Sequence, residues 1–137
     1  MVRTFVDTSA LLKKYIHETG ADEFERLIAQ TTDIAVSPIT WVEMHAALAR
    51  KTRVGAITPD QAKYVIHEAR SDYRHFRHVR WTDALVEKSC EIADQFQIKT
   101  LDSIQLASGV LSIADCFVTA DVRLFIEAKK LLKSVLV

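Results

Sequence analysis

The sequence predicts an α/β fold, a three-layer α/β/α domain with a mostly parallel central sheet. Short runs rich in β-branched and aromatic residues alternate with longer segments of helical periodicity. Two of these runs, at 2–6 and 116–119, end beside a carboxylate and are each followed by a helical pattern. Strands separated by helices require crossover connections, which give a parallel sheet covered on both faces.

Length and composition predict one domain over 1–137. A chain of 137 residues, 49% of them hydrophobic, can bury the core of a single domain, and 3 Gly and 2 Pro leave no linker-like segment. No apolar run approaches the roughly 20 residues needed to span a bilayer, and Arg3 and Asp7 interrupt any signal peptide. The two cysteines, Cys90 and Cys116, are predicted to be reduced. We therefore expect a cytoplasmic protein with no membrane association.

The net charge is zero, but the charges are unevenly distributed. The segment 50–80 holds 8 basic and 3 acidic residues, whereas 1–49 holds 4 and 7 and 81–137 holds 6 and 8. A basic face can attract a polyanion even when the total charge is zero. An ordinary solvated helix surface explains the same distribution.

The first half of the chain is predicted to form two strands and four helices. Gly55 should separate the last two helices, which form a helical arm, and Thr58 with Pro59 is a helix-start signal. Ser37 and Pro38 form a similar signal, with Ser as N-cap and Pro at the first helical position. The predicted strands are 2–6 and 33–36, and the predicted helices are 9–16, 21–30, 39–52 and 59–75.

In the second half, the segment 79–81 is predicted to be a short strand or extended chain. Thr82 and Thr100 are predicted to cap two helices, Asp121 to open a third, and 94–99 to form a turn between the first two. The predicted helices are 83–95, 101–111 and 121–132. The predicted strands are 116–119 and, at the sheet edge, 134–137.

Four carboxylates stand out by their positions in this predicted fold. Asp7 and Asp121 lie at strand ends, and Asp102 lies in the first turn of a helix. An open sheet places strand ends and the following helix starts along one edge, where ligands bind. Glu43 shares an apolar, inward-looking stripe of its helix with Ala47. We therefore expect all four carboxylates to line one cleft.

Three of these acids also have a purely structural explanation. Asp7 and Asp121 could simply cap helices, which is worth about 1 kcal/mol, and Asp102 could interact with a helix dipole. Together, however, four carboxylates would repel one another and raise one another's pKa unless a cation lay among them. Oxygen ligands without His or Cys favour Mg²⁺ or Mn²⁺, and such a site suits phosphodiester hydrolysis.

The segments around these acids resemble the four acidic motifs of PIN-domain ribonucleases: VDTSALL, ITWVEMHAAL, TLDSIQLA and FVTADVRL. The small single-domain form is similar to VapC-type toxins of toxin–antitoxin pairs. The resemblance implies a PIN-like fold, Mg²⁺- or Mn²⁺-dependent cleavage of RNA, a homodimer, and a cognate antitoxin whose tail enters the acidic groove. The implied catalytic and metal-binding residues are Asp7, Glu43, Asp102 and Asp121. The implied supporting hydroxyls belong to Thr8, Ser9 and Thr119.

Two positions depart from the usual pattern of this family. Gln105 stands where the family often has His, and Lys99 stands near a position where Arg is common. Both keep hydrogen-bonding ability, so the departures concern substrate contacts rather than the metal site. The segment 70–81 mixes arginines with aromatic residues, which can bind unpaired bases and phosphates, although an ordinary helix end, with its basic residues facing the negative end of the helix dipole, is the favoured explanation. The candidate RNA contacts are Arg74, Arg77, Lys99 and Gln105.

The predicted dimer has some support in the residues themselves. The hydrophobic content is high for so small a chain. Trp41, Tyr64 and Phe76, on the helical arm, are aromatics of the kind favoured at interfaces, although they can equally pack within the monomer.

Two other functions could use a fold of this class, phosphotransfer and non-catalytic binding. Receiver and haloacid-dehalogenase folds also place an Asp after the first strand. The first expects an acidic pair at the start and a late Lys, and the second expects an Asp where Ser9 stands. A non-catalytic RNA- or protein-binding module would keep the fold and use the basic segment. The presence of all four acids argues against that alternative.

Overall fold

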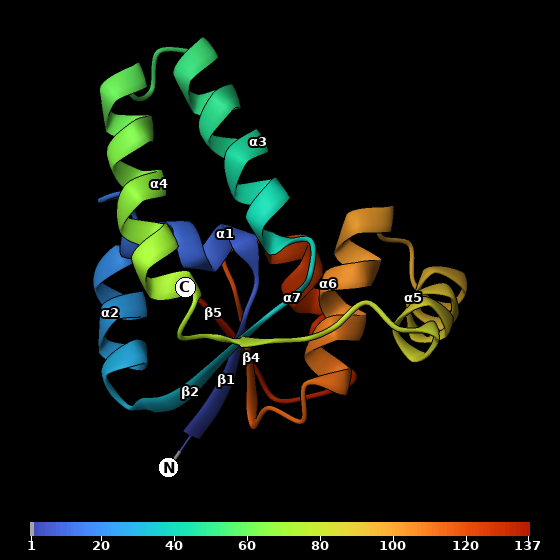
Figure 1. Ribbon diagram of the computed structural model, residues 1–137. Coiled ribbons are helices and arrows are strands. Elements are labelled where there is room, and N and C mark those ends of the chain that lie inside the picture. Colours follow the sequence, from blue (N-terminus) through green and yellow to red (C-terminus); the bar gives the residue numbers. More distant parts are fainter. Residues whose placement is uncertain (1) are drawn as a thin grey trace.

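Figure 1 shows the computed structural model of the protein, which describes residues 2–137. Five strands form one sheet in the order β3-β2-β1-β4-β5, and all neighbouring strands are parallel. Helices cover both faces, so the predicted three-layer α/β/α fold is confirmed. The elements are β1 (Val2–Val6), α1 (Thr8–Leu11), η1 (Leu12–Lys14), α2 (Ala21–Ala29), β2 (Thr31–Val36), α3 (Thr40–Arg53), α4 (Pro59–Tyr73), β3 (Arg77–His78), α5 (Asp83–Gln95), α6 (Thr100–Leu111), β4 (Cys116–Thr119), α7 (Val122–Ala128) and β5 (Ser134–Leu136).

Side chains alternate across the sheet and so form two cores. In β1, Phe5 packs beneath α5, α6 and α7, whereas Val6 packs beneath α1 to α4. Phe117 and Val118 repeat this alternation in β4. Because successive residues of a strand point to opposite faces, the central strands are apolar on both sides, as in buried parallel sheets.

Helix α6 lies unusually close to the sheet because it carries a glycine there. A Cβ atom at Gly109 would lie 2.5 Å from Cδ2 of Phe117, whose ring stacks on Phe5 with centroids 5.3 Å apart. This close approach packs α6 directly on the two central strands, β1 and β4.

The strand order creates a crevice beside β1. The chain adds β2 and β3 on one side of β1, then crosses to add β4 and β5 on the other side. The connections that leave β1 and β4 therefore diverge, and ligands of open α/β sheets bind at such a switch point. Asp7 follows β1 and Asp121 follows β4, so both lie at this crevice.

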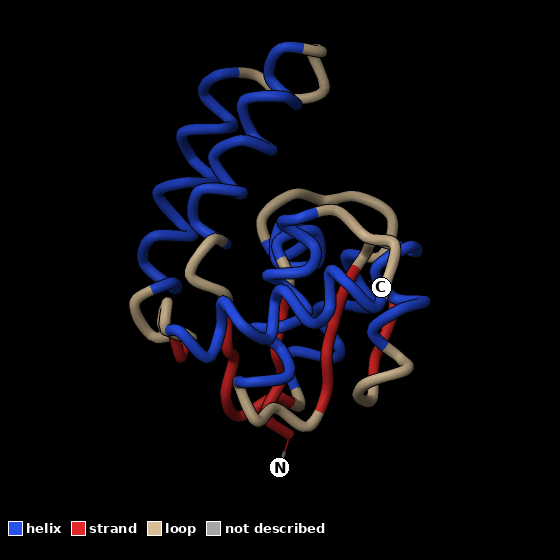
Figure 2. Tube along the Cα trace, turned by 90° about the vertical axis from the view of Figure 1, so that its right-hand side faces the viewer, coloured by secondary structure: helices blue, strands red, loops and turns tan. Residues whose placement is uncertain are grey.

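Helices α3 and α4 form an arm that projects beyond the sheet (Figures 1 and 2). Gly55, with φ of +76°, turns the chain between them, as predicted. Thr58 then caps α4 in a capping box with Gln61, and Pro59 takes the first helical position. None of the helices described between residues 2 and 137 combines the length and apolar character needed to cross a membrane.

Two predicted helix caps are wrong. Helix α3 begins at Thr40, and Ser37 instead stabilises the turn before it and pairs with Ser108, whose Oγ donates to Ser37 Oγ at 3.0 Å. Helix α6 includes Thr100, and its N-cap is Lys99. Ser37 thus accepts a local hydrogen bond from Ile39 and a tertiary one from Ser108, and no side chain caps α3.

Several element boundaries also differ from the prediction. The first helix is two short pieces, α1 and η1, and β2 starts at Thr31. Helix α7 ends at Ala128, four residues early, because the chain must turn back to pair β5 beside β4. The short strand β3 is Arg77–His78, while 79–81 is extended chain. Cys90 and Cys116 are both free.

Candidate active site

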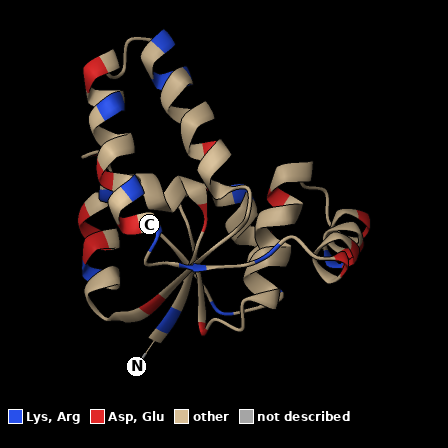
Figure 3. Ribbon diagram, in the orientation of Figure 1, with Lys and Arg blue, Asp and Glu red and all other residues tan. Residues whose placement is uncertain are grey.

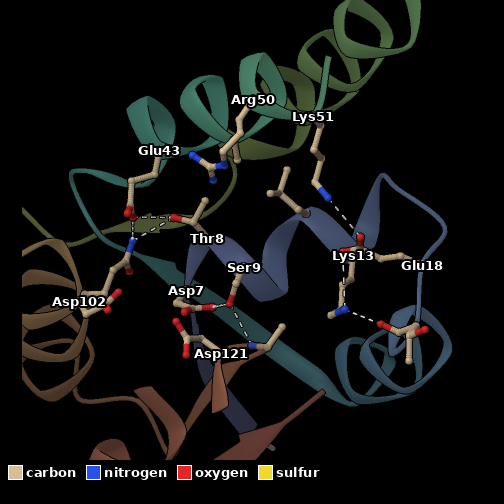
Figure 4. A pocket seen from close by; sticks show the side chains of 15 residues that line it. Asp7, Thr8, Ser9, Lys13, Glu18, Glu43, Arg50, Lys51, Asp102 and Asp121 are labelled. Atoms are coloured by element: carbon tan, nitrogen blue, oxygen red, sulfur yellow. Dashed lines mark hydrogen bonds and ion pairs between the residues drawn. The ribbon is translucent and has the colours of Figure 1, made fainter. Parts of the chain in front are cut away.

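All four predicted acids line one cleft of about 570 Å³, formed by α1, α3, α6 and the chain leading into α7 (Figure 4). Asp7 and Asp121 come from the strand ends, Glu43 from α3 and Asp102 from α6. The residues that surround each carboxylate decide what that carboxylate can do.

Asp7 is the most enclosed of the four, with 4% of its surface exposed. Its Oδ1 accepts from Ser9 Oγ at 2.8 Å and from the backbone N–H of Ala10 at 3.1 Å, and its Oδ2 accepts from Thr119 Oγ1 at 2.8 Å. Burial raises the pKa of Asp7 to about 7 despite these donors, and repulsion from Glu43 adds to the shift. Asp7 caps α1 and also presents a carboxylate that a cation would stabilise.

The two carboxylate oxygens of Asp121 have different surroundings. Oδ1 accepts from the backbone N–H groups of Arg123 at 2.9 Å and Leu124 at 3.3 Å, so the predicted capping of α7 is present. Within residues 2–137, no hydrogen bond reaches Oδ2. The capping explanation and a role in the cleft are therefore compatible for this residue.

Two hydroxyl groups connect Asp7 to the chain around Asp121. Thr119 Oγ1 donates to Asp7 and accepts from the backbone N–H of Asp121 at 3.0 Å. Ser9 Oγ donates to Asp7 and accepts from the backbone N–H of Ala120 at 3.0 Å. These contacts fix the two strand ends relative to each other.

Glu43 is held by donors on its Oε1 atom. Thr8 Oγ1 donates to it at 2.8 Å, and Gln105 Nε2 donates at 2.6 Å. The same Nε2 lies 3.0 Å from Thr8 Oγ1 and 3.2 Å from Thr40 Oγ1. Gln105 is 2% exposed and so ties α6, α1 and α3 together from inside the protein.

Gln105 also holds an unsatisfied atom. Its Oε1 is buried and has no hydrogen-bond partner within residues 2–137. A buried carbonyl oxygen without a donor costs stability, and here the amide is held in place by the three oxygen atoms around its nitrogen. Gln105 was predicted as an RNA contact, and the structure places its amide nitrogen on Glu43.

Asp102 is partly buried and faces other acids. Burial raises its pKa, repulsion from Asp121 and Glu43 raises it further, and Lys99 opposes the shift. The cleft therefore concentrates negative charge that the side chains around it do not compensate fully.

The carboxylates line one cleft, but their side chains are too far apart to ligate one metal ion as they stand. Among residues 2–137, no three His, Cys, Asp or Glu side chains are grouped closely enough to hold a metal ion. The donor chemistry nevertheless fits a hard cation, because the four predicted ligands offer only oxygen atoms. Burial, with repulsion from neighbouring carboxylates added, raises the pKa values of Asp7 and Asp102, and a cation bound in the cleft would oppose that shift.

One wall of the cleft is basic, a feature that the sequence reasoning missed. Lys13, Arg50 and Lys51 line it, and Lys13 and Lys51 pair with Glu18 at 3.5 and 3.4 Å. Arg50 has no ion pair within residues 2–137, and Figure 4 shows it reaching over the cleft from α3. Its position seven residues after Glu43 places it on the same helix face, which was the available signal.

The other predicted RNA contacts lie outside the cleft lining. Arg77 is engaged in an ion pair with Asp33 at 2.8 Å and donates to the backbone oxygen of Ser112 at 2.7 Å. Lys99 lies at the start of α6, close enough to influence Asp102, and Arg74 lies at the end of α4. The cleft therefore contains only Gln105 of the four.

The aromatic residues expected at a dimer interface divide into two groups. Trp41 and Phe76 pack partly against the core, whereas Tyr64 is 64% exposed. Packing within the monomer thus accounts for most of the Trp41 and Phe76 surfaces.

The sequence pattern of the PIN domain matches residues 4–131. A search of curated proteins gives no match.

Several solved structures share the fold. A protein of a toxin–antitoxin complex from Klebsiella pneumoniae is 20% identical, with 89% of each chain covered and a TM-score of 0.65. PAE2754 from Pyrobaculum aerophilum is 19% identical, covering 98% of this chain and 84% of that one, with a TM-score of 0.71. VapC20 from Mycobacterium tuberculosis, a Sarcin-Ricin loop cleaving toxin, is 18% identical, covering 88% and 92%, with a TM-score of 0.63.

Proposed function

Because the chain belongs to the PIN domain family, we propose that it is a metal-dependent endoribonuclease that hydrolyses RNA phosphodiester bonds in the acidic cleft. The observation that carries this proposal is the set of four carboxylates lining one cleft, where burial and mutual repulsion raise the pKa of Asp7 and of Asp102. Perturbed acids gathered in a cleft are a mark of functional sites.

Asp7, Glu43, Asp102 and Asp121 would hold one or two Mg²⁺ or Mn²⁺ ions. Such an ion supplies charge neutralisation at the phosphate and a more acidic bound water. Asp121 would contribute Oδ2, since its Oδ1 caps α7. Asp7 would act from a fixed position, since Ser9 and Thr119 bind its two oxygens.

The remaining side chains would orient the substrate and accept a proton. Arg50 reaches over the cleft without an ion pair in the described chain, so its guanidinium would bind the phosphate that is cut. Glu43 receives both of its donors on Oε1, which leaves Oε2 to accept the proton of the attacking water. Gln105 would position Glu43 for this step.

We further propose that this nuclease is the toxin of a VapBC-type pair, acting in the cytoplasm as a homodimer of single-domain chains. The structural similarity to a protein of the Klebsiella pneumoniae toxin–antitoxin complex and to the Mycobacterium tuberculosis toxin supports this proposal. A cognate antitoxin would place a segment in the acidic cleft, beside Arg50 and Lys51.

The toxin proposal is tested by expressing the chain alone in bacteria. Growth arrest that is relieved by co-expression of the reading frame adjacent to its gene would support the proposal. Unimpaired growth would contradict it, and light scattering tests the dimer.

The nuclease activity is tested with a structured RNA labelled at one end. Discrete cuts should form with Mg²⁺ or Mn²⁺ and disappear with EDTA, and Asp102→Asn should lose them. Asp94→Asn is the matched control, because Asp94 is an exposed acid on α5 outside the cleft. Cleavage that survives both EDTA and Asp102→Asn would refute the proposed site.

A further inference from the structure

A second concave region lies at the base of the arm, apart from the acidic cleft. This aromatic–basic pocket has a volume of about 760 Å³ and lies between the start of α3, the end of α4 and the extended chain that follows β3. Its principal residues are Trp41, Arg70, Tyr73, Arg74, Arg80 and Trp81. None of its lining residues is acidic, in contrast to the cleft.

The aromatic rings of the pocket offer stacking surfaces. Trp41 and Tyr73 lie with centroids 4.9 Å apart and form the inner wall, and His78 packs edge-on against Tyr73 at 4.6 Å. Trp81 is 57% exposed and belongs to no aromatic pair within residues 2–137. An indole left this open is unusual, and planar bases are the partners that stack on such rings without strict sequence preference.

The cations of the pocket are available for a ligand. Arg70, Arg74 and Arg80 form no ion pair within the described chain, although Arg70 lies over the Trp41 ring at 5.4 Å. Arg77, between them in sequence, is by contrast engaged with Asp33. Figure 3 shows the basic segments following one another from the end of α4 along the chain toward α5. Unpaired guanidinium groups around aromatic faces suit the alternating bases and phosphates of a single strand.

The pocket and the cleft lie on opposite faces of the same helix. Trp41 and Glu43 are two residues apart in the first turn of α3, so their side chains point about 200° apart around the helix axis. Pro38 and Val79, which also line the pocket, lie two residues after the end of β2 and one residue after the end of β3. Both regions therefore lie at the carboxyl edge of the sheet, separated by about one helix diameter, 10–12 Å.

We propose that the aromatic–basic pocket binds an unpaired nucleotide of the RNA strand that passes through the acidic cleft, with the base stacked on Trp81 and the phosphates bound by Arg74 and Arg80. The proposal rests on the proposed nuclease function for the identity of the strand. Aromatic residues and arginines also occur at protein interfaces. A surface with three unpaired arginines and no acid at all favours a polyanion over a protein.

The tryptophans give a direct readout of this pocket. The chain contains two, and both line the pocket. We therefore expect a single-stranded oligoadenylate of about 12 nucleotides to quench the intrinsic fluorescence of the intact protein, in EDTA so that no cleavage occurs. Trp81→Ala should weaken binding by roughly tenfold, as expected when one stacking partner is lost.

The arginines are tested by the salt dependence of binding. The double variant Arg74→Gln/Arg80→Gln should lower the slope of log K against log salt by about 1.4, because each single-strand phosphate contact contributes about 0.7. Arg53→Gln and Tyr64→Ala are the matched controls, since both residues are exposed and lie outside the pocket. Both controls should bind the oligonucleotide as the wild type does.

Two results would overturn the proposal. One is oligonucleotide binding that leaves the fluorescence unchanged and is equal in the wild type and in both pocket variants. The other is a change of molecular mass in light scattering for Trp81→Ala with unchanged oligonucleotide affinity, which would identify the pocket as a protein interface. Failure of the nuclease function has a different signature, since quenching and the salt slope would persist in a protein that cuts no RNA.

Discussion

The acidic cleft and the aromatic–basic pocket share the first turn of α3 but differ in charge and in the kind of side chain that lines them. The cleft gathers four carboxylates, buries Asp7 and raises its pKa, whereas the pocket contains unpaired arginines and an exposed tryptophan. The cleft is acidic except for one basic wall, and the pocket contains no acid. The difference is consistent with the two proposals above, a cation bound in the cleft and an anion bound in the pocket.

The comparison also explains the neutral total charge of the chain. Eighteen basic and eighteen acidic residues cancel in the sum, but the cleft is lined by more acids than bases and the pocket by arginines without acids. The partners of this protein are therefore better predicted from the local electrostatic potential of each region than from the net charge.

The largest expected effect concerns the uncompensated charge of the cleft. Burial raises the pKa of Asp7 to about 7, above an unfolded value of about 3.9. Because the folded protein holds the proton of Asp7 more tightly than the unfolded chain does, this proton stabilises the fold. The stabilisation is fully present below about pH 4 and is lost as the pH rises through 7. In EDTA, Asp7→Asn should gain stability over the wild type between these limits, by up to about 4 kcal/mol.

Urea unfolding at several pH values measures this effect. Asp94→Asn, at an exposed acid, should follow the wild type throughout. A constant difference between Asp7→Asn and the wild type from pH 4 to 8 would show that burial does not raise the pKa of Asp7 as described above.

A second prediction separates the two regions kinetically. Asp102→Asn should lower kcat for RNA cleavage by at least about 100-fold, some 2.7 kcal/mol, while the affinity for oligoadenylate in EDTA does not fall. Trp81→Ala should instead weaken substrate binding, so that KM rises while kcat changes little. If both variants changed the same parameter, the two regions would not have separate roles.

A third prediction concerns the hydrogen bonds that hold Glu43. Gln105→Leu should destabilise the protein by about 1–3 kcal/mol, because Glu43, Thr8 and Thr40 lose a buried donor. Gln97→Leu, at an exposed position outside the cleft, should change the free energy of unfolding by less than about 0.5 kcal/mol. If thermal or urea unfolding gave the same change in the free energy of unfolding for both substitutions, Gln105 would not hold Glu43 in position.

The sequence predicted the features that depend on local pattern. The strand 116–119 and the helix that Thr82 caps have the predicted bounds, because periodicity and turn residues suffice to identify them. Asp7 and Asp121 could be placed at one sheet edge because a parallel sheet leaves few alternatives.

The sequence did not predict the features that depend on tertiary contacts. Ser37 has the residue type of a helix cap, but its bond to Ser108 spans 71 positions. The contact between Gln105 and Glu43 spans 62, so no local pattern shows that this amide holds the acid. The basic wall was not predicted either, because Lys13 and Arg50 come from different elements that only the tertiary fold brings to one cleft, although the spacing of Arg50 from Glu43 already places these two on one helix face.

The most direct test of the acidic cleft as a metal site is a pair of melting curves for the wild type and Asp121→Asn, one with Mn²⁺ and one with EDTA. Asn caps helices about as well as Asp, so in EDTA the two proteins should differ by a few tenths of a kcal/mol at most, or the variant should be slightly more stable. Mn²⁺ at 100 times its Kd should stabilise the wild type by about 2.7 kcal/mol and the variant far less. If Asp121→Asn keeps the full Mn²⁺-induced shift and cuts RNA at the wild-type rate, Asp121 is only a helix cap and the four-carboxylate site is wrong.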